Sequence, residues 1–282
     1  MGHSISWGIG PILAYTGEGA SGNPVIFFVA GVTAIIAAWA APIVNVSDFA
    51  RLARSTKAQA VGQTVGLVVT YLLFAIASIA IIVGSEIAFG TPIWNVLDVV
   101  ARFDSTFAIA ISVLTLCLTT LSVNVTGNIV PAGYQLASLF PSKLTFKSGA
   151  MIAAVIGILV MPWKLMENAT SIFTFLNIIG GILAPIAGVM LAHYFVVSKT
   201  EIDLAELYSK NGKYNYKSGF NVNALVTTVI AGMLSLIGNF VPFFKPLYDM
   251  SWFVGIISAF ILYSLLELRR NKSVSPRNRQ VE

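Results

Sequence analysis

Charged residues are scarce in this sequence. Asp, Glu, Lys and Arg make up only 10% of its 282 residues, against roughly 25% in an ordinary soluble domain. Apolar residues make up 56%, and the mean hydropathy is +0.82. A water-soluble protein cannot hide that much apolar surface and still keep a polar exterior. The composition therefore excludes a soluble globular protein and predicts an integral membrane protein.

Cysteine is nearly absent, and the sequence has none of the residue clusters typical of catalytic or metal sites. The single cysteine, Cys117, lies in an apolar run and cannot form an internal disulfide. The sequence shows no metal-ligand cluster, no nucleophile paired with a base and no phosphate-binding glycine loop. The formal charge of +5 comes from short basic clusters between apolar runs, so it indicates membrane topology. We therefore expect no enzyme, no metal or organic cofactor, and no nucleic-acid partner.

Seven long apolar segments are present instead. Crossing the hydrocarbon layer takes roughly 20 mostly apolar residues as a helix, because every backbone amide must be satisfied internally. The segments lie approximately at 24–47, 62–84, 106–130, 149–163, 171–197, 222–241 and 251–268. They predict an all-α polytopic membrane protein, with a segment 1–23 before the transmembrane domain 24–268 and a tail 269–282 after it.

Basic residues alternate between the connections of these spans. They cluster after the first, third, fifth and seventh spans, whereas the other side holds only Arg102, Lys164 and Lys245, each near an acidic residue. Because basic residues are retained in the cytoplasm, the pattern predicts a cell-membrane protein with a cytoplasmic C-terminus and an outside N-terminus. Residues 1–22 lack a cleavable signal peptide, so an outside start suggests further helices upstream of Met1.

The first predicted span is interrupted in the stretch AIIAAWAAPIVNVSDF. Pro42 removes a backbone donor and clashes with the preceding turn, so we expect the helix to break or kink there. Membrane helices tolerate such breaks where they line a cavity, and transporters use them to bind substrates. Trp39 lies beside this break, far from either predicted end of the span. It could face a binding cavity, or it could be an interfacial tryptophan on a kinked structural helix.

The third predicted span is polar on two faces. Two stripes follow the helix period on roughly opposite sides: Thr115, Thr119, Ser122 and Thr126 form one, and Thr120, Asn124 and Asn128 form the other. A helix with two polar faces cannot lie against lipid. The asparagines could join helices, at about 1 kcal/mol or less per bond, or they could contact a substrate. In the fifth span, Asn177 could face a cavity, and His193 is either interfacial or part of proton coupling.

Several separated motifs resemble one transporter family. One stretch, NVSDFARLAR, follows Trp39 and resembles the signature N-x-x-D-F/Y-x-R of the nucleobase:cation symporter-1 family. A second stretch, SVNVTGNIVPAGYQLASLFP, resembles that family's eighth helix and the loop after it. Three further stretches resemble the bacterial allantoin permeases of the family: GTPIWNVLDVVARFD, MPWKLMENATSIFTFL and KPLYDMSWFVG. The motifs occur in the family's order and cover about residues 8–267.

The resemblance implies both a fold and a function. Family members have two inverted repeats of five helices, followed by two peripheral helices, and the spans here would correspond to helices six to twelve. The implied function is cation-coupled uptake of a small planar nitrogen heterocycle, such as allantoin, a purine, a pyrimidine or a hydantoin. The implied partners are that small molecule, the lipid bilayer and, for a split transporter, a separate chain supplying the first five helices. The alternative is a membrane interaction or scaffold subunit that does not transport.

The resemblance also implies site residues. Trp39 matches the tryptophan that stacks on the heterocycle, and Asn128 matches the asparagine that hydrogen-bonds its amide edge. Asn124 matches a neighbouring asparagine, and Ala38 lies next to Trp39. A cation site would correspond to Thr119, Ser122 and Val123. Because Val123 stands where the family's sodium site has a threonine hydroxyl, we expect proton coupling in preference to sodium coupling.

Overall fold

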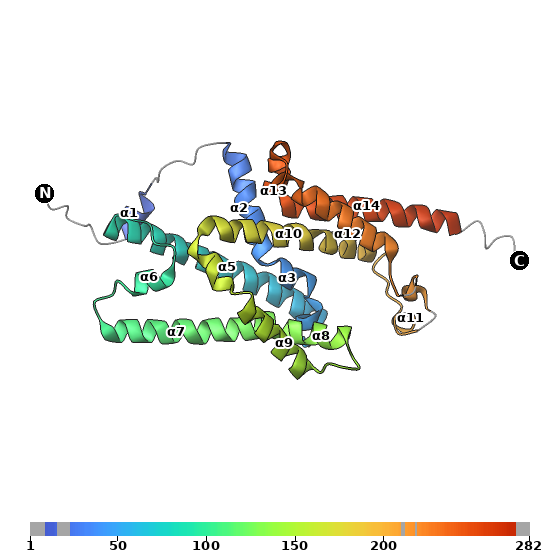
Figure 1. Cartoon of the computed structure of the whole chain (residues 1–282), viewed down its shortest axis with the longest axis horizontal. Coiled ribbons are helices and arrows are strands. Elements are labelled where there is room, and N and C mark those ends of the chain that lie inside the picture. Colours follow the sequence, from blue (N-terminus) through green and yellow to red (C-terminus); the bar gives the residue numbers. More distant parts are fainter. Residues whose placement is uncertain (1–8, 16–22, 210–211, 218, 275–282) are drawn as a thin grey trace, which may run out of the picture. The chain divides into compact units, whose positions relative to one another are not determined.

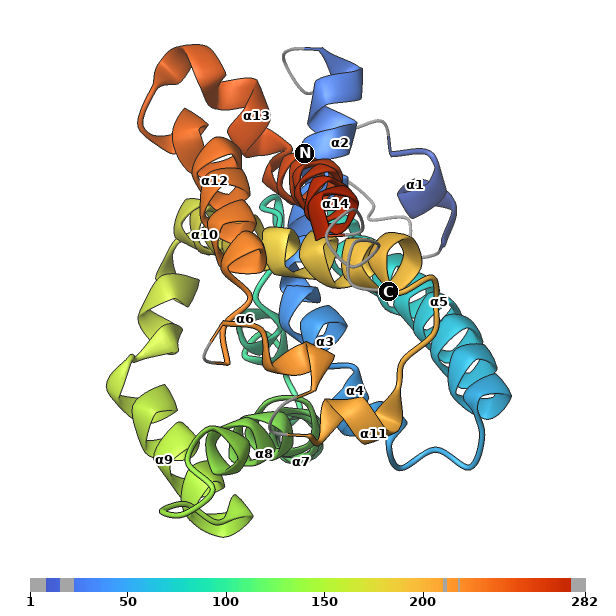
Figure 2. The ribbon, with the colours of Figure 1, turned by 90° about the vertical axis from the view of Figure 1, so that its right-hand side faces the viewer.

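The computed structural model describes residues 9–15, 23–209, 212–217 and 219–274. Within these ranges the chain forms helices and turns and no β-strand, which confirms the all-α prediction. The chain divides into two compact units, residues 1–21 with 47–159 and residues 22–46 with 160–282. Figures 1 and 2 show the helices of both units.

Unit 1, residues 1–21 with 47–159, contains the second to fourth predicted spans. Its helices are α1 (Ile9–Leu13), α4 (Ser47–Ala50), α5 (Thr56–Phe89), α6 (Val96–Val100), α7 (Thr106–Asn124), the π-helix η1 (Val125–Ile129), α8 (Val130–Leu139) and α9 (Phe146–Leu159). Helices α7, η1 and α8 form one continuous run (Figure 1). Helices α8 and α9 pack closely where two glycines meet. A Cβ on Gly149 would lie only 2.8 Å from the carbonyl oxygen of Gly133, so the absence of a side chain allows this approach.

Unit 2, residues 22–46 with 160–282, contains the first predicted span and the last three. Its longer helices are α2 (Pro24–Ala38), α10 (Ala169–Ala192), α12 (Val222–Leu236) and α14 (Ser251–Val274). Its shorter elements are α3 (Ala40–Val44), η2 (Pro162–Glu167), the π-helix η3 (His193–Val197), α11 (Leu204–Leu207), η4 (Lys213–Asn215), η5 (Ile237–Asn239), η6 (Pro242–Phe244) and α13 (Lys245–Asp249).

Helix α10 is central to unit 2 and packs against α2, α12 and α14 (Figures 1 and 2). Small residues allow these close approaches: a Cβ on Gly180 would lie 2.7 Å from Cβ of Ala37 in α2. A Cβ on Gly188 would clash with the carbonyl oxygen of Ile256 in α14. The buried core of the unit consists of Ala40, Ala184, Ala187 and Trp252. Unit 2 is therefore held together by tight helix–helix contact, as expected in lipid, where helices gain little from the hydrophobic effect.

Short polar residues start most of the long helices. Their side-chain oxygens accept a hydrogen bond from a backbone N–H in the first turn, which satisfies a donor that the helix leaves open. These N-cap residues are Asn23 for α2, Ser55 for α5, Ser105 for α7, Asn168 for α10 and Asn221 for α12.

Six helical runs in the described part of the chain are long and apolar enough to cross a membrane. Helix α2, with 15 residues, is a shorter apolar helix and continues past a break into α3. The six runs overlap the second to seventh predicted spans, and α2 with α3 overlaps the first. The predicted span limits remain predictions, since α5 and other helices run beyond them. Residues 1–8 and 16–22 of the N-terminal segment and residues 275–282 of the tail lie outside the described residues.

Candidate substrate and cation site

The break predicted in the first span lies at Trp39. Helix α2 ends at Ala38 and α3 begins at Ala40, and Trp39 itself leaves the helical region with φ −103° and ψ 6°. Pro42 explains the position, because it has no N–H to donate to the carbonyl of Ala38 and its ring clashes with that carbonyl. The chain therefore changes course at the residue that the family resemblance assigns to substrate stacking.

The side chains at this break divide into a buried set and an exposed set. Ala37 and Ala40 are 2% and 0% exposed and pack within unit 2. The Trp39 side chain remains 39% exposed, and its neighbour Ala38 is exposed as well. The small residues thus let the backbone sit deep in the unit, while the indole extends from it.

Asn177 lies close to this region on α10. It is one turn before Gly180, which meets Ala37 of α2. The Asn177 carboxamide oxygen is buried and accepts no hydrogen bond from the described residues, whereas its backbone oxygen accepts one from Ser251 Oγ at 3.2 Å. A buried acceptor without a donor is costly, so this oxygen can accept a hydrogen bond from a ligand or from water.

The two asparagines of α7 and η1 form a chain of hydrogen bonds along unit 1. Asn124 Nδ2 donates to the carbonyl oxygen of Thr120 at 2.8 Å, and Asn128 Nδ2 donates to Asn124 Oδ1 at 2.8 Å. Asn128 Oδ1 and the second hydrogen of its amide have no partner among the described residues, and both asparagines are exposed within the unit. Asn124 therefore orients Asn128, which still offers one donor and one acceptor.

The helix around Asn128 is a π-turn. The N–H of Val130 donates to the carbonyl of Val125, five residues back. Pro131, which follows, cannot donate to the carbonyl of Gly127, so the regular pattern cannot continue unchanged. Single π-turns of this kind are frequent at functional sites. Sequence reasoning missed this turn, although Gly127 and Pro131 were visible signals of an irregular helix.

The candidate cation residues lie on the same helical run. Thr119, Ser122 and Val123 are all exposed within unit 1. The carbonyl oxygen of Ser122 already accepts a hydrogen bond from Thr126 Oγ1 at 2.9 Å. Val123 brings no side-chain oxygen, so the side chains of the three residues supply two hydroxyl oxygens. Because Trp39 belongs to unit 2 and these residues to unit 1, a site that joins them remains a prediction.

The two quoted family motifs meet inside unit 1. Asp48 and Arg51, from NVSDFARLAR, contact residues from the stretch SVNVTGNIVPAGYQLASLFP. The Arg51 guanidinium carbon lies 3.5 Å from the ring centroid of Tyr134, and Gln135 Nε2 donates to Asp48 Oδ2 at 3.4 Å. These residues thus hold α4 against α8. These contacts give the charged residues Asp48 and Arg51 a structural role in unit 1.

A second polar network, which sequence reasoning did not identify, joins η3 at the end of α10, the residue that caps the start of α12, and α14. Asn221 Nδ2 donates to Tyr263 Oη at 2.8 Å, and Tyr263 Oη lies 2.9 Å from His193 Nδ1. Tyr216 Oη lies 3.5 Å from the other ring nitrogen of His193. Burial raises the pKa of Tyr216, so this loop tyrosine remains a neutral hydroxyl. The geometry gives His193 a structural set of partners.

Glu267 extends the same network by one helical turn. Its side chain is fully buried and accepts a hydrogen bond from Asn223 Nδ2 at 2.8 Å. Its other oxygen lies 3.0 Å from the Arg270 guanidinium. A lone glutamate in the apolar run before Arg269 was the signal that could have revealed this site. The pairing neutralises a charge that would otherwise be expensive at this depth.

Comparison with known proteins places the chain in a family. The model of the family described as permease for cytosine/purines, uracil, thiamine, allantoin matches residues 3–255.

The chain belongs to this permease family.

Two relatives show how this permease chain compares with longer proteins. It is 47% identical over 263 residues to the allantoin permease of Bacillus subtilis (strain 168), and covers 54% of that protein. It is 52% identical over 265 residues to an Escherichia coli (strain K12) protein provisionally named an allantoin permease, and covers 55% of it. Each alignment takes in 93% of this chain. The permease chain thus spans about half the length of the relatives it matches.

A solved structure confirms the fold of the permease chain. Mhp1, described as a nucleobase-cation-symport-1 family transporter, was determined in a closed conformation with bromovinylhydantoin bound. The match has a TM-score of 0.65 at 30% identity, and covers 88% of this chain and 53% of Mhp1. The resemblance inferred from the motifs is confirmed, and the chain is a multi-pass membrane protein that matches about half of this inverted-repeat transporter fold.

Proposed function

We propose that this chain is the part of a cation-coupled permease that corresponds to family helices six to twelve, and that the complete permease takes up allantoin or a closely related planar heterocycle. The observation that carries this proposal is the pair of site features in the two units. An indole projects from a helix break in unit 2, and an oriented carboxamide with a spare donor and acceptor lies on a π-turn in unit 1.

These two features suit the chemistry of the ligand class. Allantoin, hydantoins and pyrimidines carry alternating N–H and C=O groups on a flat ring. Such a ring needs an aromatic face to stack on and an amide that can donate and accept. The names of the relatives support the same class, since they refer to allantoin, and Mhp1 was solved with a hydantoin bound. Transport involves no covalent step, so the proposal assigns no catalytic residue.

Proton coupling is the second part of the proposal. Sodium is bound by several hard oxygen ligands, and the candidate site offers the hydroxyls of Thr119 and Ser122 but only an apolar side chain at Val123. A weaker oxygen set favours coupling to protons. The charge pattern supports an orientation in which the C-terminus is cytoplasmic and residue 1 of this chain lies on the outer side.

The test is uptake by a completed permease. We define the completed permease as this chain joined behind the N-terminal half of the Bacillus subtilis allantoin permease. Cells expressing it are expected to accumulate labelled allantoin, and a proton uncoupler should abolish uptake while removal of sodium should not. The 282-residue chain alone should show no uptake, because it would supply only part of the cavity wall. Equal uptake by the chain alone, or none by a correctly inserted completed permease, would contradict the proposal.

A further inference from the structure

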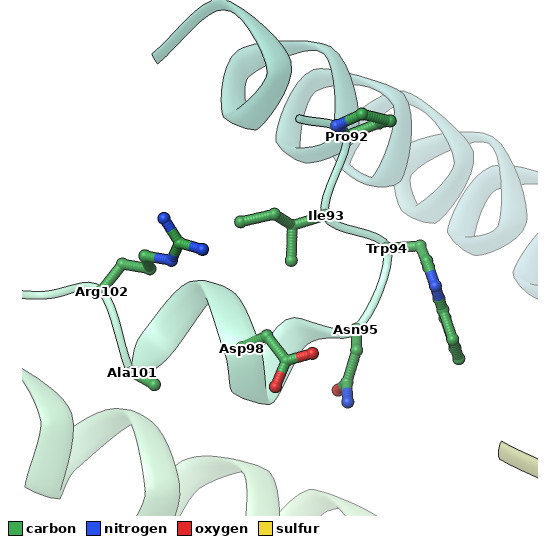
Figure 3. Close-up of a pocket in the computed structure, with 7 residues that line it drawn as sticks. All are labelled: Pro92, Ile93, Trp94, Asn95, Asp98, Ala101 and Arg102. Carbon is green, nitrogen blue, oxygen red and sulfur yellow. The ribbon is translucent and has the colours of Figure 1, made fainter. Parts of the chain in front are cut away.

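A separate pocket lies in unit 1, in the connection between α5 and α7. It has a volume of about 370 Å³ and is lined mainly by residues of the stretch Pro92–Arg102 (Figure 3). The pocket lies just before the start of α7, whereas Asn128 lies 22 residues further along the same helical run, or roughly 30 Å along the helix axis. The pocket is therefore distinct from the position of Asn128, and its lining residues all belong to this chain.

The backbone around the pocket is held in place by specific hydrogen bonds. Helix α5 ends at Gly90, which adopts φ 73° and donates to the carbonyl of Glu86 at 2.8 Å. The buried hydroxyl of Ser85 then accepts a hydrogen bond from the N–H of Ile93 at 2.8 Å. This contact holds the backbone of Ile93, a residue that is only 9% exposed and lines the pocket. The pocket thus exists before any ligand arrives, which lowers the cost of binding.

The polar groups of the pocket are not paired with each other. Neither Asp98 nor Arg102 forms an ion pair within 4.0 Å among the described residues. The Arg102 guanidinium instead lies 5.0 Å from the ring centroid of Phe89. Figure 3 shows Arg102 extending toward Ile93, whereas the Asp98 carboxylate lies on the side of Asn95. Asn95 uses its oxygen to accept from the N–H of Leu97, which leaves its NH₂ group available.

The combination of charges limits the class of ligand. A carboxylate or phosphate ligand would be attracted by Arg102 but repelled by Asp98, and a cation would meet the reverse. A neutral molecule with both N–H and C=O groups can donate to Asp98 and accept from Arg102. Trp94, which is 49% exposed, adds an aromatic surface for a flat ring.

We propose that this pocket is a second, low-affinity binding site for a neutral planar amide heterocycle, and that it acts as an outer capture site for the transported compound. The choice of ligand class rests on the proposed function. Arg102 donates to a ring carbonyl, Asp98 accepts from a ring N–H and Trp94 covers one face of the ring. The volume lies at the lower end of that of small-molecule sites, about 300–1,000 Å³.

The test uses the 282-residue chain itself, purified into lipid nanodiscs, because the pocket needs no other chain. Allantoin is the probe, and binding is measured by ligand-observed nuclear magnetic resonance. We expect saturable binding that weakens at least tenfold in Trp94→Ala and in Arg102→Gln. Trp163→Ala is the matched control, since Trp163, in the short helix η2, has a similar exposure of 51% and does not line the pocket. Asp98→Asn removes the proposed acceptor carboxylate and should also weaken binding, and Asp104→Asn, which changes an aspartate outside the pocket lining, is its control.

The outcomes separate this inference from the proposed function. Binding that survives Trp39→Ala and Asn128→Ala but is lost in the pocket variants supports the capture site, even if the completed permease does not transport. Binding that is absent from the wild-type chain, or unchanged in Trp94→Ala and Arg102→Gln, overturns the inference and leaves the proposed function standing. Thermal melting of each variant identifies any that fails to fold. If Trp94→Ala fails, Trp94→Phe replaces it, and because phenylalanine keeps an aromatic face this variant should retain binding.

Discussion

Trp39 is the residue whose surroundings argue most clearly for contact with a ligand. Its neighbours Ala37 and Ala40 are buried, while the indole extends from the helix break. Apolar side chains of a membrane protein are also exposed to lipid, so the feature that favours ligand contact is the helix break beside the indole, because broken membrane helices are tolerated where they are buried in protein or line a cavity. The alternative of an interfacial tryptophan on a structural kink predicts that the ring can be replaced without effect on substrate affinity.

Truncation of this ring distinguishes the two interpretations. Stacking of a flat ring on an aromatic side chain contributes about 1–3 kcal/mol, and 1.4 kcal/mol corresponds to a factor of ten. We therefore expect Trp39→Ala to raise the KM for allantoin in the completed permease about tenfold or more, with Trp39→Phe between it and the wild type. Trp163→Ala should leave KM unchanged. An unaltered KM in Trp39→Ala at normal expression would favour the structural interpretation.

Asn128 poses a similar question, because an intramembrane asparagine can join helices or bind substrate. Asn128→Ala should raise the KM for allantoin about tenfold, since a hydrogen bond to substrate contributes about 1 kcal/mol or more, with little change in melting temperature. Asn223→Ala provides the contrast, because Asn223 donates to the buried Glu267 and should lower the melting temperature without changing KM. A large loss of stability in Asn128→Ala with normal affinity would identify Asn128 as a helix-joining residue.

Sequence reasoning at the residue scale identified candidates but not their partners. Pro42 predicted the break and the stripe of Thr120, Asn124 and Asn128 predicted a polar face, and the structure shows both. The orientation of Asn128 by Asn124, and the contact of Arg51 with Tyr134, could not be predicted. The first depends on side-chain rotamers, and the second joins residues far apart in the sequence.

At the scale of elements, α10 shows how membrane helices achieve contact through small residues. Gly188→Ala would place a methyl group against the backbone oxygen of Ile256 in α14, and backbone cannot move aside as a side chain can. We expect a loss of about 1–3 kcal/mol of stability, as for overpacked cores. Gly157→Ala in α9 is the control, because a Cβ there meets nothing within 4 Å. Thermal unfolding in detergent measures both, and equal stability would contradict the close contact.

The network around Glu267 fastens the ends of α12 and α14. Glu267→Ala removes the acceptor of Asn223, and because Arg270 is half exposed to solvent we expect a cost of about 1–3 kcal/mol, the penalty of a buried polar group left unsatisfied. Glu267→Gln retains an acceptor for Asn223 and should cost less. The exposed pair of Lys245 and Asp249 is the comparison, and Asp249→Ala should cost about 1 kcal/mol or less. Similar losses in Glu267→Ala and Asp249→Ala would show that the buried network contributes little.

Helix type and helix limits were the least predictable features of the elements. Apolar runs predicted that helices exist at all seven positions, because length and hydropathy are local properties. The π-turn at Val125–Ile129 and the continuation of that run to Leu139 were not predicted. Both depend on how Gly127 and Pro131 redistribute backbone hydrogen bonds, which the apolar pattern does not encode.

At the scale of the whole molecule, composition and motif order predicted the membrane class, the family and the relation to part of a longer transporter fold. The comparisons confirm the family, and the chain covers about half of its relatives. A site that combines Trp39 of unit 2 with Asn128 of unit 1 remains a prediction from the family resemblance, because composition carries no information about it. The predicted orientation rests on the distribution of basic residues, which acts when the chain is inserted into the membrane. No contact within the chain tests that orientation.

The family resemblance and the proposed function predict that Trp39 and Asn128 face one binding cavity in the completed permease. The measurement is cross-linking of Trp39→Cys with Asn128→Cys by a short bifunctional thiol reagent. It uses a completed permease from which Cys117 and every other native cysteine have been removed. A shared cavity predicts an efficient intramolecular cross-link for this pair and a poor one for Ile35→Cys with Asn128→Cys, which moves the first thiol one helical turn away. If both thiols react singly in the inserted protein but positions 39 and 128 do not cross-link, the two residues do not share a cavity.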